Sequence, residues 1–147
     1  MRPDSPRALK PDLPMRSYAL GQTSDLLRRT AFQANRACVL KHADAVHDLR
    51  VSIRRLTQCL RTFGQFLPQA RARKIRQKLK ATLDLASLVR NRDVALDLLR
   101  RAALPPGSPL LEVLAEERTQ ATQALLEELK LWAKKDIQKK WRSRLGL

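Results

Sequence analysis

Residues 45–63, AVHDLRVSIRRLTQCLRTF, combine a helical apolar period with a dense row of basic side chains. The apolar positions recur every three or four residues: Leu49, Ile53, Leu56, Leu60 and Phe63. This spacing places one apolar stripe along a helix and predicts that the stripe is buried. We expect Asp44 to cap the start of this helix and Pro68 to stop it, because the residue before a proline avoids helical dihedral angles.

The basic side chains of this segment lie beside the apolar stripe. At about 100° per residue, one narrow sector of the helix holds four of them: His47, Arg50, Arg54 and Arg61. Arg55 lies off this row. Guanidinium groups form bidentate, charge-assisted hydrogen bonds to phosphate oxygens and stay charged at any working pH. The row therefore predicts a surface that binds repeated phosphate groups.

The same apolar period recurs in three further segments: residues 17–41, 69–103 and 109 to the C-terminal end. Residues 104–109 form the clearest linker, and Ser108 before Pro109 is a suitable helix start. Nothing in the sequence alternates with the period of a strand. Short connections favour antiparallel neighbours, so we predict an all-α fold, an antiparallel four-helix bundle.

We divide the chain into a disordered N-terminal arm, residues 1–16, and one helical domain, residues 17–147. The arm holds four prolines and lacks the apolar run of a secretory signal. No stretch approaches 18 uncharged apolar residues, so we predict no membrane span and a cytoplasmic location. Cys38 and Cys59 lie in apolar-periodic segments without a metal-ligand neighbour, and we expect both to be buried free thiols.

The composition favours an anionic partner. Thirty Lys and Arg against 14 Asp and Glu give a formal charge of +16. Such an excess repels itself in a compact state, and binding an anion relieves that repulsion. The charge alone leaves three classes of partner open, namely nucleic acid, a membrane surface and polyphosphate.

Two further basic clusters lie outside the first segment. One opens the predicted helix over 69–103 and includes Lys74 and Lys78. Cations at a helix N-terminus oppose the helix dipole, so their crowding there suggests contact with an anion. The other cluster lies near the C-terminus: Lys134, Lys135, Lys139 and Lys140. These side chains either contact a ligand or are solvated and complement the dipole of a last helical turn.

The sequence lacks the motifs of an enzyme. It offers no convincing arrangement of Ser, Cys and His, and its four glycines form no phosphate-cradling loop. His42 and His47 fall on different helical faces without a carboxylate cluster, so no metal site is predicted. A lone histidine such as His47 is more commonly a structural hydrogen-bonding residue than a ligand contact. We expect a protein that is not an enzyme and uses no cofactor.

Residues 47–56, HDLRVSIRRL, resemble the signature of the CHAD family, the conserved histidine α-helical domain. A second stretch, residues 90–94, is similar to the family's Arg-Asp-x-Asp-Val motif. Three of its residues stand on motif positions: Arg90, Asp93 and Val94. Asn91 replaces the first aspartate, which removes one internal partner for an arginine. The resemblance covers about residues 16–147.

The resemblance implies a helical domain that binds inorganic polyphosphate through a basic surface, sometimes at polyphosphate granules. It implies five binding residues: His47, Arg50, Arg54, Arg55 and Arg90. Charge and position alone add five more candidates: Arg61, Lys74, Lys78, Lys134 and Lys135.

The resemblance also bears on assembly, because family domains comprise two four-helix bundles whose basic faces line a shared groove. This chain has room for one bundle. We therefore expect a half-length member that pairs with a second copy, or the N-terminal part of a longer protein. A homodimer would bring the basic faces of two copies together in one groove.

Two other functions are kept as alternatives. A nucleic-acid-binding helical module suits the charge equally well, and nucleic acid would then compete with polyphosphate. Only six aromatic residues are available for stacking on bases, which argues mildly against it. The second alternative is a structural adaptor that docks an acidic partner.

Overall fold

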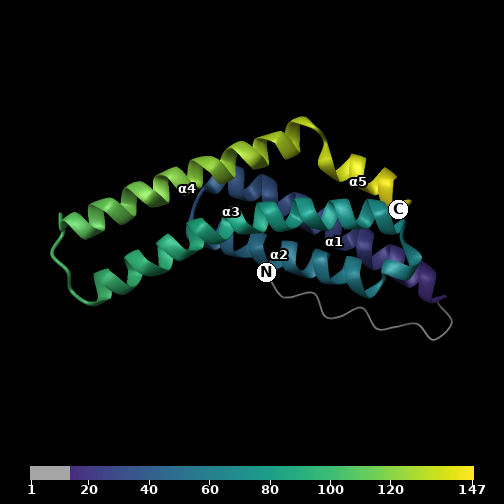
Figure 1. The fold of residues 1–147 in the computed structure, drawn as a ribbon, viewed down its shortest axis with the longest axis horizontal. Helices are drawn as coiled ribbons and strands as arrows, with labels where there is room; N and C mark the ends of the chain where they lie inside the picture. The colour runs from purple at the N-terminus through teal and green to yellow at the C-terminus, as the bar shows by residue number, and fades with distance from the viewer. Residues whose placement is uncertain (1–13) are drawn as a thin grey trace.

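The periodic segments of the sequence form helices in residues 14–147, the part of the chain that the computed structural model describes (Figure 1). Five α-helices and one 3-10 turn follow one another: α1 Met15–Leu40, α2 Ala43–Thr62, η1 Gly64–Phe66, α3 Gln69–Arg101, α4 Pro109–Lys134 and α5 Ile137–Leu145. No strand occurs among these residues. The all-α fold predicted from the sequence is confirmed.

The four long helices pack as an antiparallel bundle (Figure 1). Both α1 and α3 contact α2 and α4, so the four helices surround one core. The apolar stripe of α2 lies at the centre of that core, where four side chains are at most 1 % exposed: Leu49, Ile53, Leu56 and Leu60. Burying such a side chain stabilises the fold by roughly 1.5–3 kcal/mol. The stripe thus fixes the rotation of α2 and leaves its basic row beside the core.

The ends of α2 differ from the prediction. His42, rather than Asp44, is the N-cap, and its Nδ1 accepts a hydrogen bond from the Ala45 backbone N–H at 3.2 Å. Asp44 lies inside the first turn, where its carboxylate complements the helix dipole. Phe63 ends the helix, and η1 separates α2 from Pro68. The cap was mispredicted because an unprotonated imidazole nitrogen is an acceptor that the usual capping preference does not include.

The predicted fourth helix is two helices. The chain turns at Lys135 and Asp136, and Asp136 adopts a left-handed conformation with a φ of 44°. The Asp136 carboxylate accepts a hydrogen bond from the Lys139 backbone N–H at 3.4 Å and caps α5. α5 then folds against α1 and α3, and the rings of Trp132 and Trp141 meet at 5.2 Å. The expectation of one continuous helix is wrong: the apolar period continues through Asp136, but the left-handed conformation of that residue ends α4 and starts α5.

The C-terminal part of α3 and the N-terminal part of α4 project beyond α1 and α2 as a two-helix hairpin (Figure 1). We name residues 91–120 the hairpin tip. Its helices are tied by ion pairs of Arg118 with Asp93 and of Arg92 with Glu117, the latter at 2.6 Å. No other helix covers this hairpin, and four of its large apolar side chains are exposed: Val94, Leu98, Leu110 and Val113. Val94 and Leu98 therefore lie outside the core, although both stand on the apolar period of α3.

The N-terminal arm falls mostly on residues 1–13, which lie outside the described residues. Met15 and Arg16, assigned to the arm from the sequence, begin α1. No described helix is long and apolar enough to cross a membrane.

Both cysteines are free, as predicted. Cys59 is buried, whereas Cys38 is only half-buried. Burial raises the pKa of both thiols above the ordinary value, which disfavours the thiolate at neutral pH. The cysteines therefore behave as packing residues in this fold.

Candidate functional site

α2 and α3 enclose an open groove whose walls are basic. Two adjoining hollows of about 520 and 600 Å³ form it, and both are lined by Arg61, Arg73 and Arg76. Arg54 and Lys80 are the other cations that line the hollow of about 520 Å³. We name these five side chains the basic groove. Two come from the predicted row on α2, and three come from one face of α3.

The wall on α3 follows from helical period. Arg73, Arg76 and Lys80 are spaced by three and four positions and therefore share one face. Ile75 and Leu79, interleaved with them, are at most 2 % exposed and pack in the core. The packing that buries these apolar residues thus holds the cations at the rim, facing α2.

The groove is electrostatically unbalanced. No carboxylate lines either hollow, although Lys80 pairs with the exposed Asp84 one turn away at 2.9 Å. Arg76 Nε is buried and has no hydrogen-bond partner among the described residues. A buried donor without an acceptor costs about 1–3 kcal/mol. An anion that accepted a hydrogen bond from Arg76 would remove this cost.

Arg50 lies on α2 one turn before Arg54, toward the end of the molecule that carries the hairpin tip. Arg50 Nε donates a hydrogen bond to Ser87 Oγ at 3.3 Å and ties α2 to α3. Burial, followed by repulsion from Arg54 and Arg90, lowers the pKa of Arg50 below its ordinary value. Arg54 of the first motif stretch and Arg90 of the second are thus both near enough to Arg50 to repel it. A bound anion would relieve their mutual repulsion.

Four of the five residues implied by the resemblance line neither hollow: His47, Arg50, Arg55 and Arg90. His47 and Arg55 are exposed on α2. His47 lies one turn before Arg50 on the same row, so it extends the basic surface beyond the groove. Arg55 lies off the row, as its position in the helix indicates.

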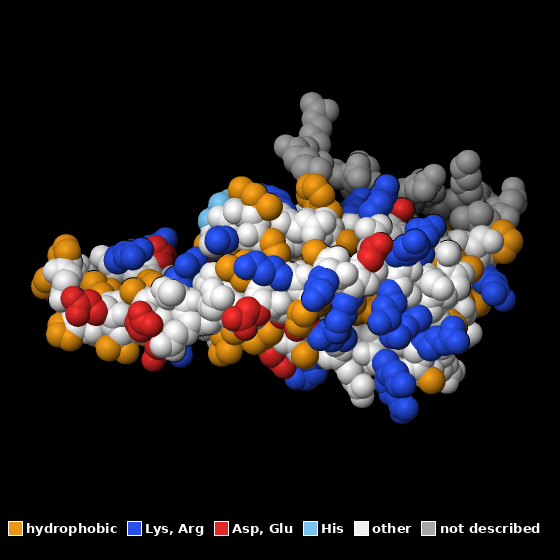
Figure 2. Space-filling model, turned by 90° about the horizontal axis from the view of Figure 1, so that it is seen from above, with side chains coloured by type: hydrophobic (Ala, Val, Ile, Leu, Met, Phe, Trp, Pro, Cys, Tyr) orange, Lys and Arg blue, Asp and Glu red, His pale blue; other side chains and the backbone are white. Residues whose placement is uncertain are grey.

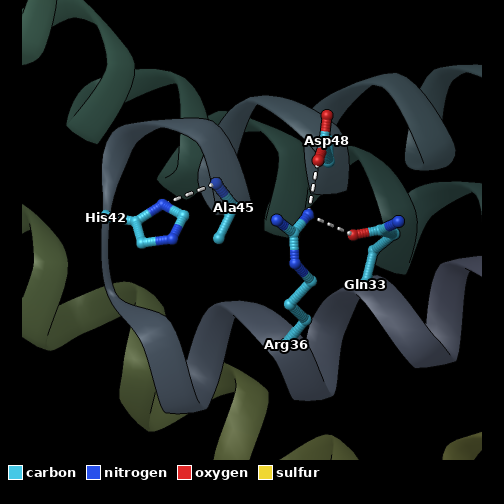
Figure 3. Close-up of polar contacts among 5 residues, drawn as sticks. All are labelled: Gln33, Arg36, His42, Ala45 and Asp48. Atoms are coloured by element: carbon cyan, nitrogen blue, oxygen red, sulfur yellow. Dashed lines mark hydrogen bonds and ion pairs between the residues drawn. The ribbon is translucent and has the colours of Figure 1, made fainter. Parts of the chain in front are cut away.

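Polar contacts fix the start of α2, through its N-cap and against α1 (Figure 3). Arg36 of α1 donates hydrogen bonds to Asp48 at 2.5 Å and to Gln33 at 3.5 Å. Asp48 is the sole carboxylate of residues 47–56, and it is engaged with α1. The cations of the row are thereby left without a carboxylate from their own segment.

Of the remaining predicted cations, Lys74 and Lys78 lie on the opposite face of α3, and Lys134 and Lys135 lie at the end of α4. Lys74 and Lys78 line a separate hollow together with Lys135. At about 100° per residue, these two lysines point roughly 150° away from the cations of the basic groove. Lys78 also pairs with Glu128 at 2.5 Å. Lys134 is exposed and lines none of the three hollows described above.

Sequence reasoning missed part of the groove. It identified a basic cluster at the start of α3 but selected Lys74 and Lys78 from it rather than Arg73, Arg76 and Lys80. The two sets fall on different helical faces, which the spacing shows. Which face meets α2 depends on how Ile75 and Leu79 pack, and spacing alone does not supply that.

Lys and Arg side chains crowd over the end of the molecule away from the hairpin tip, whereas acidic side chains are interspersed at the tip (Figure 2). Within residues 14–147, no group of three or more His, Cys, Asp or Glu side chains is arranged to hold a metal ion. The described surface therefore presents cations placed to contact an anion.

Comparison with known proteins gives one match. No curated protein and no solved structure matches this sequence. The family described as CHAD domain matches it over residues 26–146, which takes in α2, α3, α4 and both motif stretches. Because this match spans most of the 147 residues, the chain belongs to the CHAD domain family.

Proposed function

We propose that this protein binds inorganic polyphosphate in the basic groove and catalyses no reaction. The observation that carries the proposal is the groove itself, in which five cations and no carboxylate line two adjoining hollows. Membership of the CHAD domain family supports the same ligand, since polyphosphate is what the resemblance implies.

A linear anion suits this groove better than a compact one. Arg54 and Arg61 are seven residues apart on α2, which corresponds to about 10 Å along the helix axis. A single phosphate is too small to bond both, whereas a chain of phosphates presents oxygens along the whole path. Each charge-assisted hydrogen bond contributes about 1.5–3 kcal/mol. Several such bonds are enough for a micromolar dissociation constant, which corresponds to about 8 kcal/mol.

Nucleic acid is the main competing ligand. Its phosphates would meet the same arginines, but proteins that bind single strands also stack bases on aromatic rings. No aromatic side chain lines either hollow of the groove. This lining favours a polyanion that has no bases.

The test is competition among long-chain polyphosphate, duplex DNA and single-stranded RNA at matched phosphate concentration and physiological salt. We expect polyphosphate to be preferred by at least tenfold and to keep its chain length during incubation. Equal affinity for all three would overturn the proposal in favour of unselective electrostatic binding. Preference for DNA or RNA would favour the nucleic-acid module, and binding only to an acidic protein would favour the adaptor.

The proposal extends to the cell. It places the protein in the cytoplasm, at polyphosphate granules. A fluorescent fusion should coincide with the granules and disperse when polyphosphate is depleted. A fusion that stays on the same structures after depletion would contradict this location.

We also propose that two copies pair through the hairpin tip. The tip exposes four large apolar side chains and carries four Arg against five Asp and Glu, so a second copy approaches it without the repulsion of the basic body. Arg100 near the end of α3 and Glu112 at the start of α4 form no ion pair within residues 14–147. A two-fold axis can bring Arg100 of one copy against Glu112 of the other. In this proposal the two copies contact each other through the hairpin tip, whereas the sequence analysis expected them to bring their basic faces together.

A further inference from the structure

The face of α3 opposite the basic groove holds a second basic hollow, of about 210 Å³. We name it the tail pocket because α5 closes it. Its walls come from α3, from the end of α4 and from α5. Five cations line it: Lys74, Lys78, Lys135, Lys140 and Arg144.

The tail pocket is held in place by the packing of α5. Asp136 turns the chain and caps α5, which brings Lys140 and Arg144 opposite α3. Trp132 and Trp141 are at most 5 % exposed and pack edge to face in the floor of the pocket. The cations therefore stand on a rigid apolar base rather than on a loose terminal segment.

The charge of the pocket is only partly balanced. Glu128, whose side chain is 15 % exposed, pairs with Lys78 at 2.5 Å and also accepts a hydrogen bond from Trp132 Nε1 at 3.2 Å. No carboxylate lies among the lining residues. Four of the five cations form no ion pair within residues 14–147: Lys74, Lys135, Lys140 and Arg144. Their mutual repulsion favours an anion between them.

The tail pocket and the basic groove lie on either side of the first turns of α3. Gln69 and Ala70 line the groove side, whereas Arg71 Nη1 donates a hydrogen bond to the Arg144 carbonyl on the other side at 3.4 Å. A flexible anionic chain that leaves the groove over this end of α3 therefore passes into the tail pocket. The helix between the two sites is only about 10–12 Å across with its side chains.

We propose that the tail pocket is a second binding site for condensed phosphate, so that one long chain contacts both faces of α3. This inference rests on the proposed function of the basic groove. Two linked contacts raise the overall affinity, because the second contact forms at a high effective concentration. A short oligophosphate reaches one site at a time, so affinity should depend strongly on chain length.

The first test is calorimetry with inorganic tripolyphosphate. We expect two molecules to bind each wild-type chain. The variant Lys140→Ala/Arg144→Ala should lose one of them, and Arg54→Ala/Arg61→Ala should lose the other. Long-chain polyphosphate should bind each variant at least tenfold more weakly than wild type. A control variant, Lys130→Ala/Lys139→Ala, removes the same charge from α4 and α5 outside the pocket lining and should keep both sites.

A second readout reports on the tail pocket alone. The chain has two tryptophans, and both Trp132 and Trp141 line this pocket. Tripolyphosphate should therefore change tryptophan fluorescence in wild type and in the groove variant Arg54→Ala/Arg61→Ala. The change should be absent in Lys140→Ala/Arg144→Ala, whose helicity by circular dichroism should match wild type.

The outcomes separate the two proposals. One bound tripolyphosphate per chain, lost with Arg54→Ala/Arg61→Ala and silent in fluorescence, would overturn the tail pocket and leave the groove standing. Two sites that both survive Lys140→Ala/Arg144→Ala would overturn it as well. Loss of binding only in Lys140→Ala/Arg144→Ala would uphold the tail pocket and contradict the groove.

Discussion

The bundle body and the hairpin tip differ sharply in charge, although α3 and α4 run through both. Outside the tip, residues 14–90 and 121–147 contain 23 Lys and Arg against 7 Asp and Glu, whereas residues 91–120 contain four against five. The body buries its apolar stripes, and the tip leaves part of its own exposed. One end of the molecule thus suits an anion, and the other suits a protein surface.

The pairing of the arginines sharpens this difference. In the tip, Arg92, Arg101 and Arg118 each have a carboxylate partner. In the basic groove, Lys80 alone has one, at its exposed end. An arginine that is already neutralised adds little to the binding of an anion, so the number of cations is a poorer guide to a binding surface than the number without a carboxylate.

The largest expected effect is on ligand affinity in the body. Arg50→Ala/Arg54→Ala should weaken polyphosphate binding by at least tenfold and toward 100-fold, since two charge-assisted bonds of about 1.5 kcal/mol each are lost. Arg92→Ala/Arg101→Ala removes the same charge from two arginines of the tip that already have carboxylate partners, and it should change affinity less than twofold. Binding isotherms at physiological salt measure both.

Salt dependence provides the control for this pair. By analogy with DNA, each contacting cation that is removed should lower the slope of log affinity against log salt by about one. The slope should therefore fall for the body variant and stay constant for the tip variant. Equal losses of affinity and slope in the two variants would mean that the protein senses only net charge.

The next effect concerns stability at the junction of body and tip. Arg118→Ala leaves Asp93 without its partner, and the Asp93 side chain is only 12 % exposed. We expect unfolding free energy to fall by about 2 kcal/mol, and the melting temperature by about 6 °C. Arg101→Ala breaks an exposed pair with Asp97 and should cost less than about 1 kcal/mol. Thermal melts compare the two, and adding Asp93→Asn to Arg118→Ala should recover part of the loss.

A third prediction addresses the exposed apolar surface. Leu98→Glu/Val113→Glu should raise the dissociation constant of the dimer at least tenfold, because it buries carboxylates between two copies of the tip. Phe32→Glu/Val39→Glu changes two apolar residues of α1 in the body whose exposure is similar or greater, and it should leave pairing intact. Light scattering across protein concentration measures the mass. Wild-type protein that stays monomeric at every concentration and salt would refute pairing through the tip.

Much of the fold could be predicted because its causes are local. The stripe of α2, from Leu49 to Leu60, repeats with helical period and is buried as expected. The turn at Asp136 could not be predicted, because the apolar period continues through it. The exposure of Leu98 depends on a longer-range fact, that no other helix reaches the hairpin tip.

Part of the candidate site could likewise be predicted from the sequence, and part could not. The row of Arg50, Arg54 and Arg61 follows from the spacing within one helix. Its continuation onto Arg76 requires knowing which face of α3 packs against α2. Tertiary packing decides this, so a single sequence leaves both basic faces of α3 as equal candidates.

The smallest expected effect separates the two histidines of the body. His42 caps α2 through its Nδ1, whereas His47 is exposed on the basic row. His42→Ala removes the acceptor for the Ala45 backbone N–H and should lower the free energy of unfolding by about 1 kcal/mol, the usual cost of a lost cap. His42→Asn restores an acceptor and should recover most of that loss. Chemical denaturation measures all three proteins.

His47→Ala is the matched variant for this last prediction, because it removes the same side chain from the same end of α2 without touching the cap. Stability should then change by less than about 0.5 kcal/mol, as is usual for an exposed position. Polyphosphate affinity should fall severalfold, since His47 extends the row one turn beyond Arg50. His42→Ala should instead lower stability and leave polyphosphate affinity unchanged. If His47→Ala loses stability and keeps its affinity, then His47 is a structural residue and the binding surface begins at Arg50.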